Sequence, residues 1–153
     1  MKRIALLATL ALLAAAATAL AASTQTYRGK TDQGRKAYVK VKVGEVTSAN
    51  VPWIFKFGDC SPRGYALGNG KPYVYTASES NPITNNGRWF RAHRHEVFKV
   101  NGGGKATIDG RLHGHFTSGR RAVGTSVMTA KSKDSHGKHT CKRTIHFSVK
   151  LSG

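Results

Sequence analysis

Residues 141–151 read CKRTIHFSVKL, and this stretch decides the class of fold. Successive side chains of a β-strand point to opposite faces, so the residues divide into two rows. One row is mainly apolar: Cys141, Ile145, Phe147, Val149 and Leu151. The other row is polar: Lys142, Thr144, His146 and Lys150. The pattern predicts a half-buried strand with Cys141 on the core face and His146 on the outer face.

The same alternation recurs along the chain. Residues 36–46, KAYVKVKVGEV, are predicted to form one strand with Val39, Val41 and Val43 on one face and lysines on the other. Further β-rich runs are 51–58, 71–77, 87–93, 95–100, 105–109, 111–117 and 121–130. No stretch after the first 21 residues keeps a helical period.

Residue pairs typical of turns separate these runs. They are Gln33-Gly34, Asn69-Gly70, Asn86-Gly87, Asp109-Gly110 and Ser118-Gly119. Short strands at regular spacing with such turns predict an all-β protein. We expect an antiparallel sandwich or barrel of about eight or nine short strands, closed by one disulfide.

The first 21 residues have the composition of a secretory signal peptide. Lys2 and Arg3 precede an apolar run of Ala and Leu, which ends at Ala19-Leu20-Ala21. Small residues at those positions favour cleavage over retention as a membrane anchor. We expect residues 1–21 to be removed and residues 22–153 to form a single secreted β domain. The protein is then extracellular, with no transmembrane segment after cleavage.

The chain contains two cysteines, Cys60 and Cys141. An even pair in an exported chain predicts one disulfide, with two free thiols as the alternative. No local signature marks either residue as a catalytic thiol.

Positive charge dominates the composition. Without Lys2 and Arg3, 23 basic and 7 acidic residues remain, which is a formal net charge of +16. Such a domain attracts anionic polymers, whether cell-wall polymer, acidic glycan or nucleic acid. A highly charged surface that serves only solubility is the alternative.

All seven histidines lie in the second half of the chain, and four of them form two His-x-His pairs. In RLHGHF, residues 111–116, the alternation places Arg111, His113 and His115 on the outer face. In RWFRAHRHEVF, residues 88–98, aromatic residues fall in both rows, which predicts a bulge or a change of face. If the pairs lay on neighbouring strands, His93, His95, His113 and His115 could converge on zinc, copper or nickel. The nearby arginines oppose a bound cation, so no cofactor is expected.

Catalysis has no specific support in the sequence. The acidic residues are scattered, and no serine has the surroundings of a nucleophile. No catalytic residue is therefore assigned. A small secreted hydrolase that cleaves RNA through histidine acid–base chemistry remains an alternative hypothesis.

A binding or structural module is the remaining class. Cations and imidazoles on the outer sides of strands define a candidate binding surface: Lys40, Lys42, Arg111, His113, His115, Lys142 and His146. Trp89, Tyr73 and Tyr75 are candidate stacking surfaces for bases or sugars, although the core is the favoured place for the two tyrosines. We expect a binding module that contacts anionic polymers, with a His-x-His metal-binding protein as the alternative.

Scattered residues also resemble those of a known group of proteins. They are Tyr27, Gly29, Thr31, Gln33, Gly34, Cys60, Gly114, Phe116, Ala122, Gly124, Thr125 and Cys141. In this pattern the chain resembles small secreted β-sandwich proteins with one disulfide from soil actinobacteria. The glycine and tryptophan usual after the last cysteine of that group are absent here, and His146-Phe147 occupies the region. The resemblance implies export and a β-sandwich fold, and it implies no activity.

Overall fold

The computed structural model describes residues 23–55, 59–61, 73–76, 82–99, 104–134 and 137–153. These ranges contain ten β-strands and no α-helix. The strands are β1 Thr24–Thr31, β2 Lys36–Lys42, β3 Glu45–Trp53, β4 Cys60–Ser61, β5 Tyr73–Thr76, β6 Thr84–Asn86, β7 Trp89–Lys99, β8 Lys105–Ser118, β9 Arg121–Asp134 and β10 Gly137–Leu151. The predicted all-β fold is confirmed. No apolar helix of membrane-spanning length occurs in the described part of the chain.

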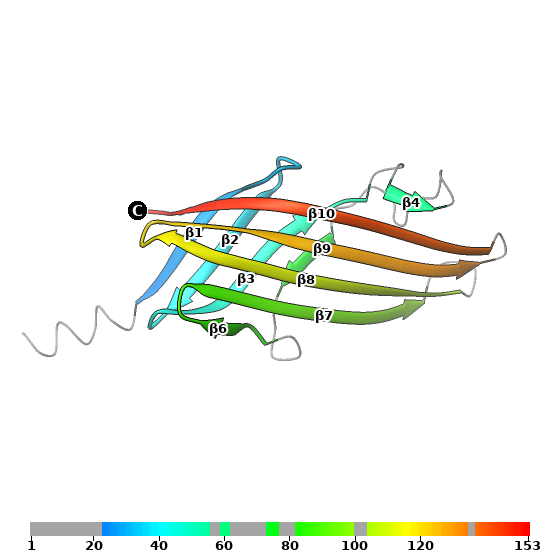
Figure 1. Cartoon of the computed structure of the whole chain (residues 1–153), viewed down its shortest axis with the longest axis horizontal. Helices are drawn as coiled ribbons and strands as arrows, with labels where there is room; N and C mark the ends of the chain where they lie inside the picture. Colours follow the sequence, from blue (N-terminus) through cyan, green and yellow to red (C-terminus); the bar gives the residue numbers. More distant parts are fainter. Residues whose placement is uncertain (1–22, 56–58, 62–72, 77–81, 100–103, 135–136) are drawn as a thin grey trace, which may run out of the picture.

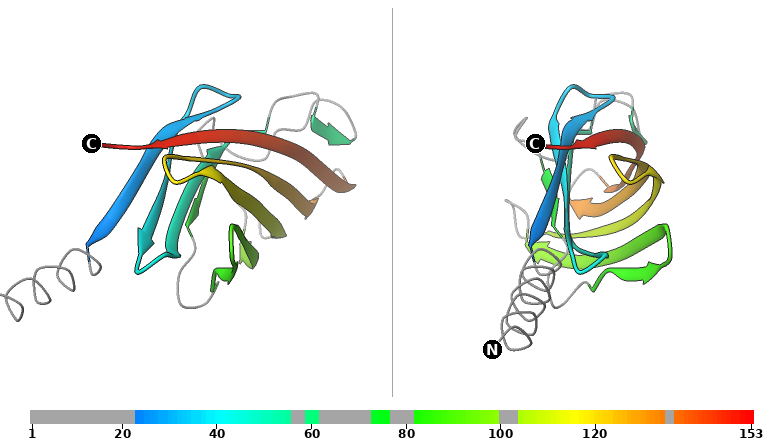
Figure 2. Two further views of the ribbon diagram at one scale, coloured as in Figure 1. Left: turned by 60° about the vertical axis from the view of Figure 1, so that its left-hand side comes forward. Right: turned by 90° about the vertical axis from the view of Figure 1, so that its left-hand side faces the viewer.

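All ten strands belong to one antiparallel sheet, in the order β5-β3-β2-β1-β10-β9-β8-β7-β6, with β4 paired to β10 (Figure 1). The sheet curls, so that β1–β3 lie on one side of the molecule and β7–β10 on the other (Figure 2). The curl brings β6 back toward β3, where the Asn85 side chain donates to the Val46 carbonyl and accepts from the Val46 amide. The Asn85 side-chain amide thus bonds both backbone groups of Val46, as a paired residue of a neighbouring strand would do.

The interior between the two sides is filled by the inward rows of the strands. Among the most deeply buried side chains are Val39, Val51, Phe90, Leu112, Met128, Ile145 and Val149. The strand predicted from 141–151 is confirmed, since Cys141, Ile145, Phe147 and Val149 are buried whereas Lys142, Thr144, His146 and Lys150 are exposed.

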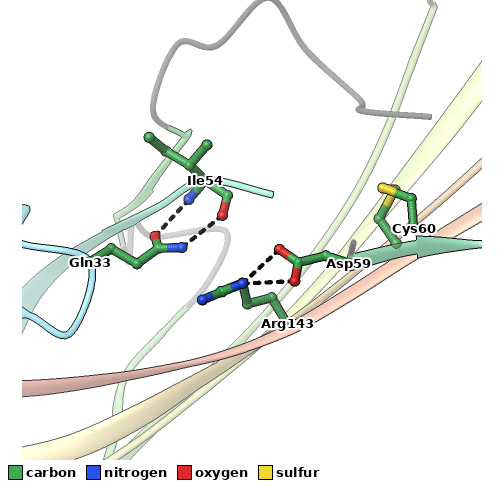
Figure 3. A network of polar contacts seen from close by, with 6 residues as sticks. Gln33, Ile54, Asp59, Cys60 and Arg143 are labelled. Atoms are coloured by element: carbon green, nitrogen blue, oxygen red, sulfur yellow. Dashed lines mark hydrogen bonds and ion pairs between the residues drawn. A yellow bond between two sulfur atoms is a disulfide. The ribbon is translucent and has the colours of Figure 1, made fainter. Parts of the chain in front are cut away.

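Cys60 and Cys141 form the predicted disulfide. The two cysteines lie directly opposite each other in the short pairing of β4 with β10. Beside them, Asp59 accepts two hydrogen bonds from Arg143, at 2.7 and 3.0 Å (Figure 3). Nearby, the Gln33 side chain donates to the Ile54 carbonyl at 2.8 Å and accepts from the Ile54 amide at 2.9 Å (Figure 3). The disulfide and the Asp59–Arg143 contact tie the residues around β4 to the long strand β10. The Gln33 contacts tie the residue that follows β3 to the turn between β1 and β2.

The structure corrects several predicted boundaries. Residues 36–46 form two strands rather than one, because Val43 and Gly44 have φ of 52° and 79° and make a tight turn between β2 and β3. Asp109-Gly110 is not a turn but lies inside β8, where Gly110 is buried and the alternation continues through it. The predicted runs 105–109 and 111–117 are therefore one strand, and β8, β9 and β10 have 14, 14 and 15 residues instead of being short.

Other turn predictions are confirmed. Gln33-Gly34 lies between β1 and β2, Gly87 follows β6, and Gly119 follows β8. Gly34 and Gly87 have φ of 75° and 57°, which a residue with a side chain rarely adopts. Asn69-Gly70 and the predicted signal peptide lie outside the described residues.

Candidate anion-binding face

The histidine pair of β8 points outward, as the alternation predicts. Leu112 and Gly114 are buried, whereas Arg111 and His113 are exposed and His115 is partly exposed. Gly114 is required here, because a Cβ atom at this position would lie 2.2 Å from the ring of Phe90. The glycine therefore leaves room for the outer edge of the Phe90 ring of β7 beneath β8.

The outer row of β7 consists of Trp89, Arg91, His93, His95 and Val97, all exposed. The predicted bulge or change of face is wrong, since β7 pairs with β8 in unbroken register from Trp89–His115 to Lys99–Lys105. The inward row continues beyond Phe90 and Ala92 through Arg94 and Glu96, which form an ion pair with each other. That pairing allows two charged residues to occupy inward positions without a shift of the strand.

The two His-x-His pairs lie on neighbouring strands, but their imidazoles do not converge. His93 is opposite Arg111, and His113 is opposite Arg91. His95 is opposite Asp109, and His115 is opposite Trp89. No histidine of one strand is therefore directly opposite a histidine of the other strand. Within the described ranges, no group of three or more His, Cys, Asp or Glu side chains could hold a metal ion.

Asp109 accepts contacts from three side chains of this face. Its carboxylate lies 2.8 Å from His93 Nε2, 3.7 Å from His95 Nδ1 and 3.5 Å from Arg111 Nε. The hydrogen bond with His93 lowers the pKa of Asp109. Partial burial opposes this shift, while the charges of His93 and Arg111 and the contact with His95 add to it. Asp109 therefore stays ionised and orients two histidines and an arginine.

Strands β9 and β10 extend the face with further polar residues. His146 of β10 is opposite Thr125 of β9, which in turn is opposite His113 of β8. In the same way Lys142 lies on the line that passes through Thr129 to Asp109. Five of the seven predicted surface residues thus share one face.

Lys40 and Lys42 do not join them. Both are exposed on β2, and β1, β10 and β9 lie between β2 and β8 in the sheet. Lys40 lies instead over the ring of Tyr38, 5.7 Å from its centre. The predicted surface is therefore divided between two sides of the curled sheet.

We define the basic face as the outward rows of β7–β10. Its cationic and imidazole side chains are Arg91, His93, His95, Lys99, Lys105, Arg111, His113, His115, Arg121, Lys131, Lys133, Lys138, Lys142, His146 and Lys150. Among the described residues of these rows, Asp109 is the single carboxylate. This imbalance is larger than the composition alone indicates, because Glu96 and Asp59 are engaged with arginines on the inner side.

The charged residues of the inward rows were not predicted from the sequence. Arg143 shares its row with Cys141 and Ile145, and Arg94 shares its row with Phe90. His139, 2% exposed, is also on the inner row of β10. The alternation along β7 and β10 was visible in the sequence, and it places all three residues on the inward rows. The tyrosines Tyr73 and Tyr75 belong to β5, whose side chains lie outside the described part.

Comparison of the chain with protein-family models, with curated proteins and with solved structures gave no match. The resemblance to secreted actinobacterial β-sandwich proteins therefore stays a prediction. In the structure, many of its pattern residues have structural tasks. Tyr27 donates a hydrogen bond to the Gly119 carbonyl at 2.8 Å, and a Cβ atom at Gly29 would lie 1.9 Å from the Ser148 oxygen.

Proposed function

We propose that the protein is exported after removal of residues 1–21 and binds anionic polymers through the basic face. The disulfide supports export, because structural disulfides persist in oxidising compartments outside the cytoplasm. The formal charge of +16 for residues 22–153 supports a polyanionic partner. The role that we propose for the protein is therefore the binding of such polymers.

One observation carries the proposal: the outward rows of four neighbouring strands hold cations and imidazoles with Asp109 as the single described carboxylate. Neighbouring strands are about 4.8 Å apart, so these charges repel one another across the sheet. A bound polyanion relieves that repulsion and releases its own counterions. The arrangement therefore stabilises a complex with an extended anion more than it stabilises the free protein.

The test is a binding titration against a single-stranded oligonucleotide and a heparin fragment at several salt concentrations. If the face neutralises about five phosphates, log K falls with log salt with a slope of about −3.5. Replacing Lys131 and Lys142 with Gln reduces that slope, whereas replacing Lys40 and Lys42, on the other side of the sheet, changes it less. Affinity that does not respond to salt would contradict an electrostatic role.

The histidines make the same binding depend on pH. Histidine is the side chain whose charge changes most readily in the physiological pH range, and protonated imidazoles attract anions. His113 is opposite Arg91 of β7 and Thr125 of β9, and His115 is opposite Trp89 of β7 and Val123 of β9. We expect affinity to rise as pH falls, and the double variant His113→Gln, His115→Gln to lose much of that rise while it keeps the salt dependence. An unchanged pH profile in this variant would remove the two histidines from the proposal.

A further inference from the structure

Trp89 is an exposed aromatic residue at the edge of the basic face. Trp89 is 60% exposed, whereas Trp53 is 2% exposed in the core. Trp89 leans against His115 of β8, with ring centres 4.4 Å apart and ring planes at 34°. The imidazole supports one side of the indole, so the ring is held in a defined position. Single exposed apolar residues are common on protein surfaces, so a role for Trp89 in binding depends on the groups around it.

The surface beside Trp89 is hollowed. One pocket of about 330 Å³ is lined by Trp89, Asn86, Thr84, Arg91 and His113. A second pocket, of about 430 Å³, is also lined by Thr84, Arg91 and His113, and it adds His93 and Arg111. The two pockets are therefore neighbours over β6, β7 and β8. Together they form a shallow hollow with an indole ring at one end and four nitrogen-bearing side chains at the other.

These four side chains form a square of hydrogen-bond donors. Arg91 is opposite His113, and one step along the strands His93 is opposite Arg111. Opposite residues in an antiparallel pair have Cβ atoms about 5 Å apart, so guanidinium and imidazole groups alternate along the second pocket, which all four side chains line. Guanidinium groups and imidazoles both donate to phosphate oxygens, and hydrogen bonds to a charged acceptor are the strong ones.

Asp109 orients half of the square. It contacts His93 and Arg111, while within the described chain the side chains of Arg91 and His113 make no hydrogen bond or ion pair. Its negative charge weakens anion binding at the end of the hollow farther from Trp89. The unengaged donors, Arg91 and His113, stand nearest to Trp89, and the strongest attraction for an anion is therefore next to the indole.

The spacing of ring and anion sites fits a nucleotide. Trp89 and Arg91 are two residues apart on an extended strand, which corresponds to about 6.8 Å along the surface. Each nucleotide of a single strand supplies one planar ring and one phosphate, and proteins bind single strands by aromatic stacking beside a cationic groove. A double helix keeps its bases stacked inside, and a sulfated glycan supplies anions without a planar π-system.

We propose that this hollow binds one nucleotide of a single-stranded nucleic acid, with the base on Trp89 and the phosphate on Arg91 and His113, beside His93 and Arg111. The inference rests on the proposed function, because it assumes that the basic face binds polyanions. It adds the class of polymer and the position of one nucleotide.

The experiment follows tryptophan fluorescence while the disulfide-bonded protein is titrated with a thymidine dodecamer or a heparin dodecasaccharide. The dodecamer is expected to quench the emission of Trp89, because a stacked base contacts the indole, whereas heparin binds without that quenching. Trp89→Ala should weaken dodecamer binding about tenfold or more and leave heparin binding unchanged. Val97→Ala, at an exposed apolar residue of the same row, is the matched control and should change neither.

A second pair of variants tests the phosphate site. Arg91→Gln with His113→Gln should lower both dodecamer affinity and quenching, whereas Lys138→Gln, an exposed cation elsewhere on β10, should lower affinity slightly and keep the quenching. Salt-dependent binding of the dodecamer without quenching, and with Trp89→Ala behaving as the unchanged protein, would overturn this inference and leave the proposed function standing. Equal quenching by heparin would also overturn the assignment to nucleic acid. Binding of neither polymer would overturn both proposals.

Discussion

At the scale of single residues, Asp109 is the acid that organises the basic face. Its contacts with His93, His95 and Arg111 lower the pKa of its carboxyl group below the ordinary value of 3.8, chiefly through the His93 hydrogen bond. A carboxyl group with a lowered pKa in the folded state stabilises the fold at pH values above its ordinary pKa. That contribution disappears as pH falls through the lowered value.

We therefore expect Asp109→Asn to lower the free energy of unfolding at pH 7 and at pH 5, and to lower it progressively less as pH falls below about 4. Urea denaturation of both proteins at these pH values measures the difference. Asp32→Asn, at an exposed carboxylate in the turn between β1 and β2, is the control. A difference that is equally large at pH 2.5 would show that the charge of Asp109 is not its source.

Alternation predicted the outward direction of Arg111 and His113 correctly, since a strand has one period. The contacts of Asp109 could not be predicted, because they depend on the register that places Asp109 opposite His95 and one step from His93 and Arg111. Register is set by packing across the whole sheet, and Asp109 itself looked like the start of a turn. The pairing of Arg143 with Asp59 was hidden for the same reason.

At the scale of elements, the hairpin of β2 and β3 carries local strain. Val43 has φ of 52° and is 69% exposed, so a β-branched residue occupies a backbone conformation that favours glycine or asparagine. Positive φ at both Val43 and Gly44 is the pattern of a type I′ turn, in which Asn-Gly is preferred.

Val43→Asn is accordingly expected to stabilise the protein by about 1 kcal/mol, because asparagine tolerates this conformation and the exposed valine makes little packing contact. The midpoint of thermal unfolding measures the change. Val97→Asn is the control, since Val97 is similarly exposed but lies within β7, where asparagine is disfavoured. A lower midpoint for Val43→Asn would contradict this account of the turn.

Strand positions were predicted better than strand ends. Gln33-Gly34 and Asn86-Gly87 are turns, but Val43-Gly44 was overlooked because valine is a strand former. Asp109-Gly110 lies inside β8 because the inward row accepts Gly110, opposite Met128 of β9 and Arg94 of β7. Pairing with β7 and β9 therefore overrode the turn preference of Asp109-Gly110. The pairing of Lys42 with Glu45 places a turn at Val43-Gly44 despite the strand preference of valine.

At the scale of the whole molecule, the disulfide joins two strands whose cysteines are 81 residues apart in the sequence. A cross-link that closes so long a loop restricts the unfolded chain and contributes about 4.5 kcal/mol in the chain-entropy model, although 2–4 kcal/mol is typical. The presence of the bond was predictable from the even count of cysteines. The curl of the sheet was not, because contacts such as Asn85 with Val46 join segments 39 residues apart.

Cys60→Ala with Cys141→Ala should lower the free energy of unfolding by about 2–4 kcal/mol. Chemical denaturation of the double variant measures the loss. The unchanged protein in the presence of a reducing agent should unfold at the same denaturant concentration, because it has lost the same cross-link. An unaltered midpoint in both cases would mean that the disulfide does not stabilise the fold.

Anionic polymers are proposed to bind the basic face of β7–β10. Amide chemical-shift mapping by NMR, with the thymidine dodecamer added stepwise to ¹⁵N-labelled protein, locates this binding residue by residue. We expect the largest shifts within residues 84–95 and 109–115, weaker shifts within 121–131 and 140–148, and little change within 36–42. Shifts centred on β1–β3, or small shifts spread evenly over the whole sheet, would contradict it.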